Sequence, residues 1–84
     1  MKHLSLTVFG KVQGVFYRAT AQEKARQLQI SCSATNHPDG SVHIEAEGEA
    51  EALQTFLDWN RHGPDTARVE KVEYTITDLN PNNS

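Results

Sequence analysis

The sequence predicts one α+β domain in which two helices cover one face of an antiparallel sheet. Apolar residues alternate with polar ones in several short segments, recur every three or four residues in two longer segments, and are separated by turn residues. With 84 residues, the chain buries only about 60 to 65% of the surface that its unfolded state exposes. We therefore expect a single domain with a thin core over residues 1–84, ending in a polar tail at 79–84.

The N-terminal part predicts a strand followed by a helix. A half-buried strand that ends at Gly10 is indicated by three apolar residues with polar neighbours on both sides: Leu4, Leu6 and Val8. The apolar spacing then lengthens, which predicts a helix over residues 17–29. Its expected buried face consists of Tyr17, Ala21, Ala25 and Leu28.

The middle of the chain predicts a β-hairpin. Residues 30–35 form the expected second strand, and the Asn-His-Pro-Asp-Gly stretch at 36–40 has the composition of a turn, because Pro38 restricts φ and Gly40 adopts positive φ freely. Val42, Ile44 and Ala46 then alternate with charged or polar residues, as in a strand with one solvated face. This third strand ends at Gly48.

The last third predicts a helix and a final strand. Apolar residues recur at helical spacing over residues 49–61, and Gly63-Pro64 ends the helix. Residues 69–76 alternate as a strand. The order is thus β-α-β-β-α-β, and right-handed connections place both helices on one face of a sheet of four, or at most five, antiparallel strands. This arrangement is the ferredoxin-like fold.

Composition excludes several classes of protein. The isoelectric point near 5.7 argues against a nucleic-acid partner. The third strand is expected to have an acidic solvent-exposed face, which argues against an RNA-binding ferredoxin-like domain. Cys32 is the single cysteine, so neither an internal disulfide nor a multi-cysteine metal site is expected. We find no apolar run of about 20 residues and no secretory leader. We therefore expect a cytoplasmic protein without a membrane partner, and we separately expect a monomer.

The connection between the first strand and the first helix is a candidate anion site. The segment from Gly10 to Arg18 contains two glycines and two cations, and no acidic residue precedes Glu23. N–H groups in the first turn of a helix carry partial positive charge, glycine allows close approach of the backbone, and the arginine fork matches two phosphate oxygens. No Gly-Lys-[Ser/Thr] or Gly-x-Gly-x-x-Gly pattern is present, so a nucleotide is not favoured.

The same segment resembles the signature of the acylphosphatase family. Residues 8–18 read Val-Phe-Gly-Lys-Val-Gln-Gly-Val-Phe-Tyr-Arg, against Gly-x-Val-Gln-Gly-Val-x-[Phe/Met]-Arg in the family, so Tyr17 is the single departure. Asn36 before Pro-Asp-Gly-Ser-Val resembles the second segment of the family, and the resemblance extends over about residues 4–76. It implies the ferredoxin-like fold that the periodicity predicts independently.

The resemblance implies hydrolysis of acyl phosphates to a carboxylate and inorganic phosphate, without metal or cofactor. Arg18 matches the phosphate-binding arginine and Asn36 the residue that positions the attacking water. Backbone N–H groups of the loop complete the expected phosphate site, namely those of Gln13, Gly14, Val15, Phe16 and Tyr17. Taken alone, Asn36 is also typical of an ordinary turn. The alternative is an acylphosphatase-like module that binds an anion or a partner without turnover.

The second strand departs from the family. Members read Gly-x-x-Gly-Trp-Val where this chain reads Gln-Ile-Ser-Cys-Ser-Ala at 29–34. We expect Gln29 to occupy a left-handed position after the helix, at a cost of about 1 kcal/mol. The absent tryptophan predicts less buried area and a more loosely packed sheet around the strand that carries Asn36.

Overall fold

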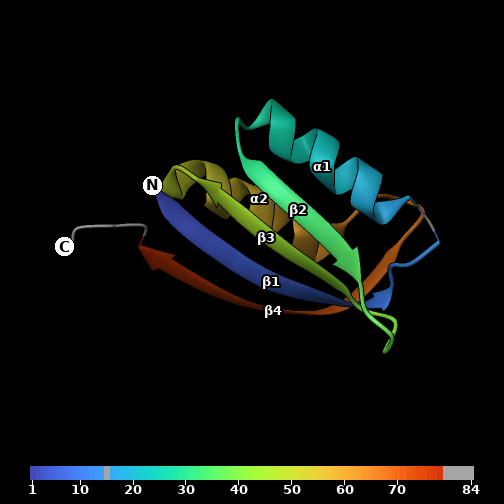
Figure 1. The fold of residues 1–84 in the computed structure, drawn as a ribbon. Helices are drawn as coiled ribbons and strands as arrows, with labels where there is room; N and C mark the ends of the chain where they lie inside the picture. The colour runs from blue at the N-terminus through green and yellow to red at the C-terminus, as the bar shows by residue number, and fades with distance from the viewer. Residues whose placement is uncertain (15, 79–84) are drawn as a thin grey trace.

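The computed structural model describes residues 1–14 and 16–78, and these form the expected ferredoxin-like fold (Figure 1). The elements are β1 (Lys2–Lys11), α1 (Tyr17–Gln27), β2 (Ser31–Asn36), β3 (Val42–Gly48), α2 (Ala50–His62) and β4 (Arg68–Asp78). The described strands form one four-stranded antiparallel sheet in the order β2-β3-β1-β4. The expected tail at 79–84 lies outside the described residues.

Both helices pack on one face of the sheet, and this face carries the core (Figure 1). Leu4 lies opposite Ala46 on one side and Ile76 on the other, so the apolar positions of three strands coincide across the sheet. Leu53, Phe56 and Leu57 of α2 are completely buried against them. Within the described chain, neither helix is long and apolar enough to cross a membrane.

The first helix ends two residues earlier than predicted. The N–H of Ile30 donates to the carbonyl of Ala25 at 2.8 Å, and that of Gln29 donates to Arg26 at 3.0 Å. This pair of bonds is a Schellman motif, which ends a helix by placing one residue in the left-handed region. Gln29 has φ 60°, as expected for the position that is glycine in the family. The turn delivers the chain directly into β2.

The position of the absent tryptophan lies outside the core that the helices cover, so its loss takes no area from that core. Ser33 pairs with Glu45 and is exposed, so a larger side chain there would lie on the face of the sheet opposite the helices. Cys32 and Ala34 are the residues of β2 that point toward the core, and both are half-buried. Burial raises the pKa of the Cys32 thiol, which packs as a small apolar group.

The end of β1 is bent by an irregularity in its pairing with β4. The register shifts between Phe9 and Gly10, where Gly10 pairs with Val69. Gly10 has φ 131°, and a Cβ atom there would lie 2.1 Å from the carbonyl oxygen of Arg68. Only glycine permits this approach, and the bend directs residues 11–14 toward the start of α1.

Candidate active site

The loop after β1 leads to a helix whose N-terminus carries no side-chain cap. Phe16 occupies the N-cap position with φ 60°, and its side chain makes no capping hydrogen bond. Thr20 donates its N–H to the Phe16 carbonyl at 3.0 Å, whereas the first N–H groups of a helix have no acceptor within the helix itself. No acidic residue lies in this first turn. The exposed donors and the helix dipole therefore favour an anion at this end of α1.

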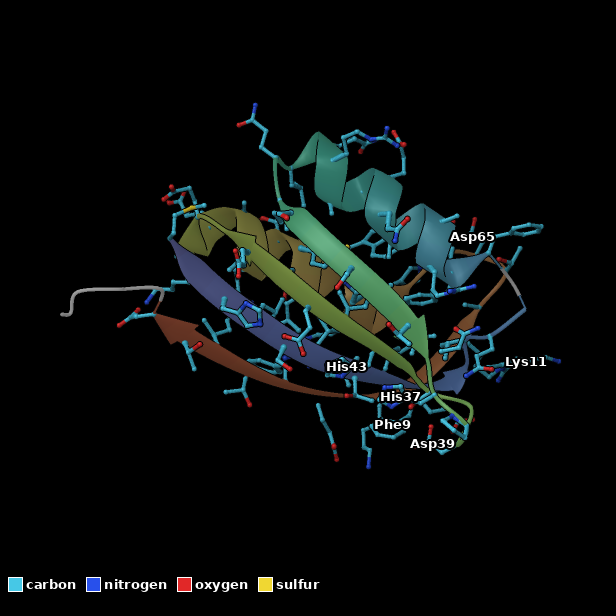
Figure 2. The ribbon with its side chains drawn as sticks, viewed as in Figure 1. Phe9, Lys11, His37, Asp39, His43 and Asp65 are labelled. Carbon is cyan, nitrogen blue, oxygen red and sulfur yellow. The ribbon has the colours of Figure 1, made fainter. Side chains whose placement is uncertain are left out.

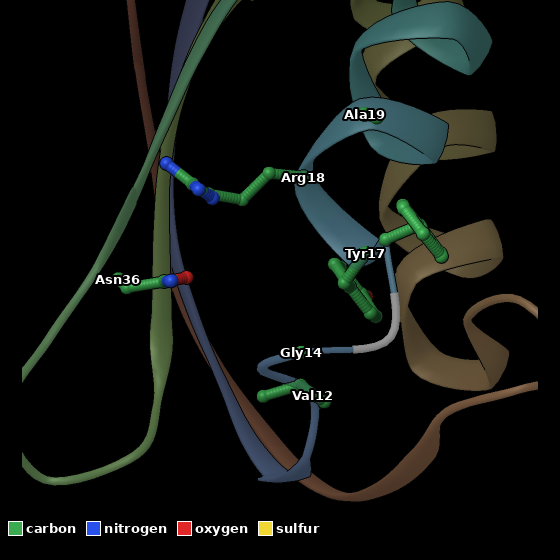
Figure 3. Close-up of a pocket in the computed structure, with 7 residues that line it drawn as sticks. Val12, Gly14, Tyr17, Arg18, Ala19 and Asn36 are labelled. Atoms are coloured by element: carbon green, nitrogen blue, oxygen red, sulfur yellow. The ribbon is translucent and has the colours of Figure 1, made fainter.

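A hollow of about 270 Å³ lies between this helix end and β2. Figure 3 shows the Arg18 side chain extending from α1 toward β2, and the Asn36 side chain extending from β2 into the same space. The hollow is lined by Val12, Gly14, Phe16, Tyr17, Arg18, Ala19 and Asn36. A guanidinium, a carboxamide and the start of a helix thus surround one space that is open to solvent.

The structure brings together most of the residues that the sequence singled out. Gly14, Phe16, Tyr17, Arg18 and Asn36 all line the hollow. Val15 was also expected to bind phosphate, but it lies outside the described residues. Arg18 and Asn36 are both exposed, so a ligand can reach them from solvent without displacing other side chains.

Two residues of the loop lie differently from the rest. Lys11 is exposed and does not line the hollow, and its side chain extends outward from the end of β1 (Figure 2). The Gln13 side chain turns toward the connection between β2 and β3, where its Nε2 donates to the carbonyl oxygens of His37 and Ser41 at 2.8 and 2.9 Å. The sequence predicted only a backbone role for Gln13, because nothing local indicates a partner 24 or more residues away.

The side chain of Tyr17 connects the start of α1 to α2. It is buried, its hydroxyl donates to Oδ1 of Asn60 at 2.7 Å, and Asn60 donates in turn to the carbonyl of Phe56 at 2.9 Å. Burial raises the pKa of Tyr17, so the phenol stays protonated as a donor. Asn60 is a buried polar residue of α2 that the apolar pattern alone did not reveal.

The connection between β2 and β3, which follows Asn36, is tightly hydrogen bonded. Asp39 Oδ1 accepts hydrogen bonds from the N–H and the hydroxyl of Ser41, at 2.9 and 2.5 Å. These bonds, the hydroxyl first, lower the pKa of Asp39. Asn36 and Val42 form the last pair of the ladder before this turn, so its geometry determines where the Asn36 side chain is held.

None of the histidines that the structure describes lines the hollow. His3 and His43 lie on the face of the sheet opposite the helices, hydrogen bonded to Glu45. The His37 ring stacks on His43 with 5.3 Å between centroids. Among residues 1–14 and 16–78, no group of three or more His, Cys, Asp or Glu residues is arranged to hold a metal ion.

Comparison with known proteins places this chain in one family. A family model described as Acylphosphatase matches residues 4–84. An acylphosphatase of Thermus thermophilus is 53% identical over 73 residues, which are 87% of this chain and 83% of that protein. The crystal structure of acylphosphatase from Bacillus subtilis superposes with a TM-score of 0.88 at 32% identity, over 92% of this chain and 86% of that one. An acylphosphatase from Coxiella burnetii gives a TM-score of 0.87 at 33% identity, with 94% and 83% covered.

Proposed function

Because the chain belongs to the acylphosphatase family, we propose that it hydrolyses acyl phosphates to a carboxylate and inorganic phosphate at the hollow between α1 and β2. The observation that carries this proposal is the convergence of Arg18 and Asn36 on one space at an uncapped helix N-terminus. The oxygen of a water molecule bonds to phosphorus as the bond from phosphorus to the acyl oxygen breaks, and both protons of the water remain with the inorganic phosphate. The leaving group departs as a carboxylate and needs no general acid.

In this proposal the loop and Arg18 bind the phosphoryl group. Backbone N–H groups over residues 13–17 and the guanidinium of Arg18 donate to its oxygens, which carry the negative charge of the transition state. Phosphoryl transfer depends mainly on such charge stabilisation and on holding the reacting groups in line. The absence of acidic side chains from the first turn of α1 supports this assignment, because an acidic residue there would repel the substrate.

Asn36 then positions the attacking water. Its carboxamide offers both a donor and an acceptor, and it extends into the hollow from the side opposite Arg18 (Figure 3). A group in that position can orient water behind the phosphorus atom while the acyl oxygen leaves toward solvent. None of these steps requires a metal ion.

Benzoyl phosphate hydrolysis tests the proposal in the wild type and in the variants Arg18→Ala and Asn36→Ala. We expect kcat/KM to fall about 100-fold or more in each variant, because each loses a contact to the reacting group. Arg18→Ala is also expected to weaken competitive inhibition by inorganic phosphate, whereas Asn36→Ala retains it. Arg26→Ala, an exposed arginine on the same helix, is the matched control and should retain wild-type activity.

A wild type that is no faster than Arg18→Ala and Asn36→Ala would contradict hydrolysis at this site. Retention of phosphate binding in such a protein would instead indicate the binding module that the sequence left as the alternative.

We propose further that the protein acts as a monomer in the cytoplasm. Both residues proposed to act on the substrate, Arg18 of α1 and Asn36 of β2, line the same hollow within one copy of the chain, so the proposed reaction does not call on a second subunit. Sedimentation equilibrium at the concentrations of the activity assay tests it, and cell fractionation tests the location.

A further inference from the structure

The side chain of Gln13 joins the two halves of the site. Gln13 lies in the loop that leads to α1, and the carbonyls it contacts belong to His37 and Ser41, on either side of the β2–β3 turn. Figures 1 and 2 show this turn lying beside the end of β1, with His37 and Asp39 on the turn and Lys11 on β1. The link is therefore a tertiary contact between the phosphate loop and the hairpin that carries Asn36.

The chemistry of this contact fixes which end of the Gln13 amide faces the turn. Both partners are carbonyl oxygens, so only the NH₂ group can bind them, and its two hydrogens serve two acceptors. Each carbonyl already accepts one backbone bond, from Gly40 to His37 at 3.0 Å and from His37 to Ser41 at 2.9 Å. The amide of Gln13 occupies their second lone pairs, so the turn and the loop form one network.

The position of this network relative to Asn36 gives it a consequence for the reaction. His37 directly follows Asn36, and Ser41 directly precedes Val42, which is the partner of Asn36 in the ladder. The two carbonyls thus flank the final pair of the hairpin on both strands. β2 is an edge strand and has few apolar contacts at this end, because Thr35 and Asn36 are both exposed.

We infer that Gln13 is a positioning residue, which holds the carboxamide of Asn36 at a fixed place relative to the phosphate loop through its bonds to His37 and Ser41. This inference rests on the proposed function for its effect on turnover, but the link itself does not. Displacement of a positioning group by about 1 Å can reduce a rate about 100-fold. Binding of phosphate by the loop and Arg18 does not require the link.

The first test is Gln13→Met, which keeps the length of the side chain and removes both donors. We expect kcat for benzoyl phosphate to fall about 10- to 100-fold, while the inhibition constant of inorganic phosphate changes less than about twofold. Gln22→Met makes the same exchange on the exposed side of α1 and should retain wild-type kinetics. A rise of the phosphate inhibition constant by the same factor as the loss in kcat would contradict the inference, since Gln13 would then support the loop itself.

The second test measures Gln13→Met in the background of Asn36→Ala. If Gln13 acts through Asn36, its substitution has no further effect on the residual rate once the carboxamide is gone, because nothing remains to be positioned. An equal loss of rate in both backgrounds overturns the inference. A general loss of folding in Gln13→Met is excluded separately by its far-ultraviolet circular dichroism and urea midpoint, so that the comparison of rates is made between folded proteins.

Amide hydrogen exchange separates the link from the proposed activity. In Gln13→Met we expect faster exchange at the N–H groups of His37 and Gly40, whose bonds belong to the turn network, with unchanged exchange in α2. Unchanged exchange at His37 and Gly40 contradicts the link whatever the kinetics. Absence of benzoyl phosphate turnover in the wild type contradicts the proposed function, while the exchange measurement still decides the link.

Discussion

At the scale of single residues, Tyr17 is the one departure from the family signature, and it differs from the usual phenylalanine by its hydroxyl group. The signature that residues 8–18 resemble has phenylalanine or methionine here, and in this chain the hydroxyl oxygen of tyrosine is hydrogen bonded to Asn60 of α2. Neither side chain is left with a buried polar atom that lacks a hydrogen bond in the described residues. The two residues form one unit that ties the start of α1 to α2.

Tyr17→Phe is therefore expected to destabilise this chain, although phenylalanine is the usual residue of the family. Removing the hydroxyl leaves the completely buried Oδ1 of Asn60 without its donor, at a cost of about 1 to 3 kcal/mol in the free energy of unfolding. Urea unfolding followed by circular dichroism measures the difference.

Asn60→Leu in the Tyr17→Phe background provides the control, because it removes the second polar group as well. We expect this double variant to recover part of the lost stability, since an apolar pair of similar size leaves no unpaired acceptor. A Tyr17→Phe variant as stable as the wild type would show that the hydroxyl makes no net contribution.

At the scale of elements, the junction between α1 and β2 determines how β2 enters the sheet. The Schellman motif ends α1 with Gln29 at φ 60°, and the next residue, Ile30, is buried in the core. A glutamine in the left-handed region costs about 1 to 2 kcal/mol. Gln29 adopts the left-handed conformation although glutamine disfavours it, because this conformation allows the two hydrogen bonds of the motif and the burial of Ile30.

Gln29→Gly should stabilise the protein by about 0.5 to 1 kcal/mol. Glycine removes the strain of the left-handed conformation but loses more conformational entropy on folding, so part of the gain is offset. Gln22→Gly, within α1, is the contrasting variant and should destabilise by about 1 kcal/mol. Thermal unfolding of the wild type, Gln29→Gly and Gln22→Gly gives the order of their stabilities. A Gln29→Gly variant less stable than the wild type would show that Gln29 is not strained.

At the scale of the whole molecule, the sheet has one face covered by helices and one face, opposite the helices, that carries a polar network. On this second face Glu45 accepts hydrogen bonds from the rings of His3 and His43 and, at 2.9 Å, from the hydroxyl of Ser5. The bond from His3 is the main cause that lowers the pKa of Glu45 from 4.5 to about 2. The same bond raises the pKa of His3 above its ordinary 6.5.

These opposite shifts predict that stability is greatest between about pH 5 and pH 6.5. Glu45 has a lowered pKa in the folded state, so its contribution is present above pH 4.5 and is lost as the pH falls toward 2. His3 has a raised pKa, so its contribution is complete below pH 6.5 and is lost as the pH rises through the folded value. Urea midpoints measured from pH 3 to pH 8 should pass through a maximum.

Glu45→Gln removes the carboxylate from this network. The urea midpoint of this variant should change less with pH than that of the wild type, on both the acidic and the basic side of the maximum. Glu51→Gln, on the exposed side of α2, is the matched control and should keep the maximum of the wild type. A profile that is unchanged in Glu45→Gln would assign the pH dependence to other groups.

The sequence alone determined the features that depend on local periodicity and local chemistry. Alternation and helical spacing predicted all six elements within two or three residues, because each element must bury one face. The Gly10 to Arg18 string and Asn36 indicated the family and the loop. Pro38 and Gly40 located the hairpin turn, because they restrict or permit φ, and the resemblance to the family, which has glycine at position 29, indicated the strained position at Gln29.

Only the tertiary structure decided which residues meet across the fold. The Gln13 side chain binds carbonyls 24 and 28 residues away, and Tyr17 binds an asparagine 43 residues away, so no local pattern reveals either contact. The face on which Ser33 lies likewise follows from the register of β2 with β3. Register and side-chain pairing are set by the packing of the whole chain, since a shift of one residue would exchange the two faces of a strand.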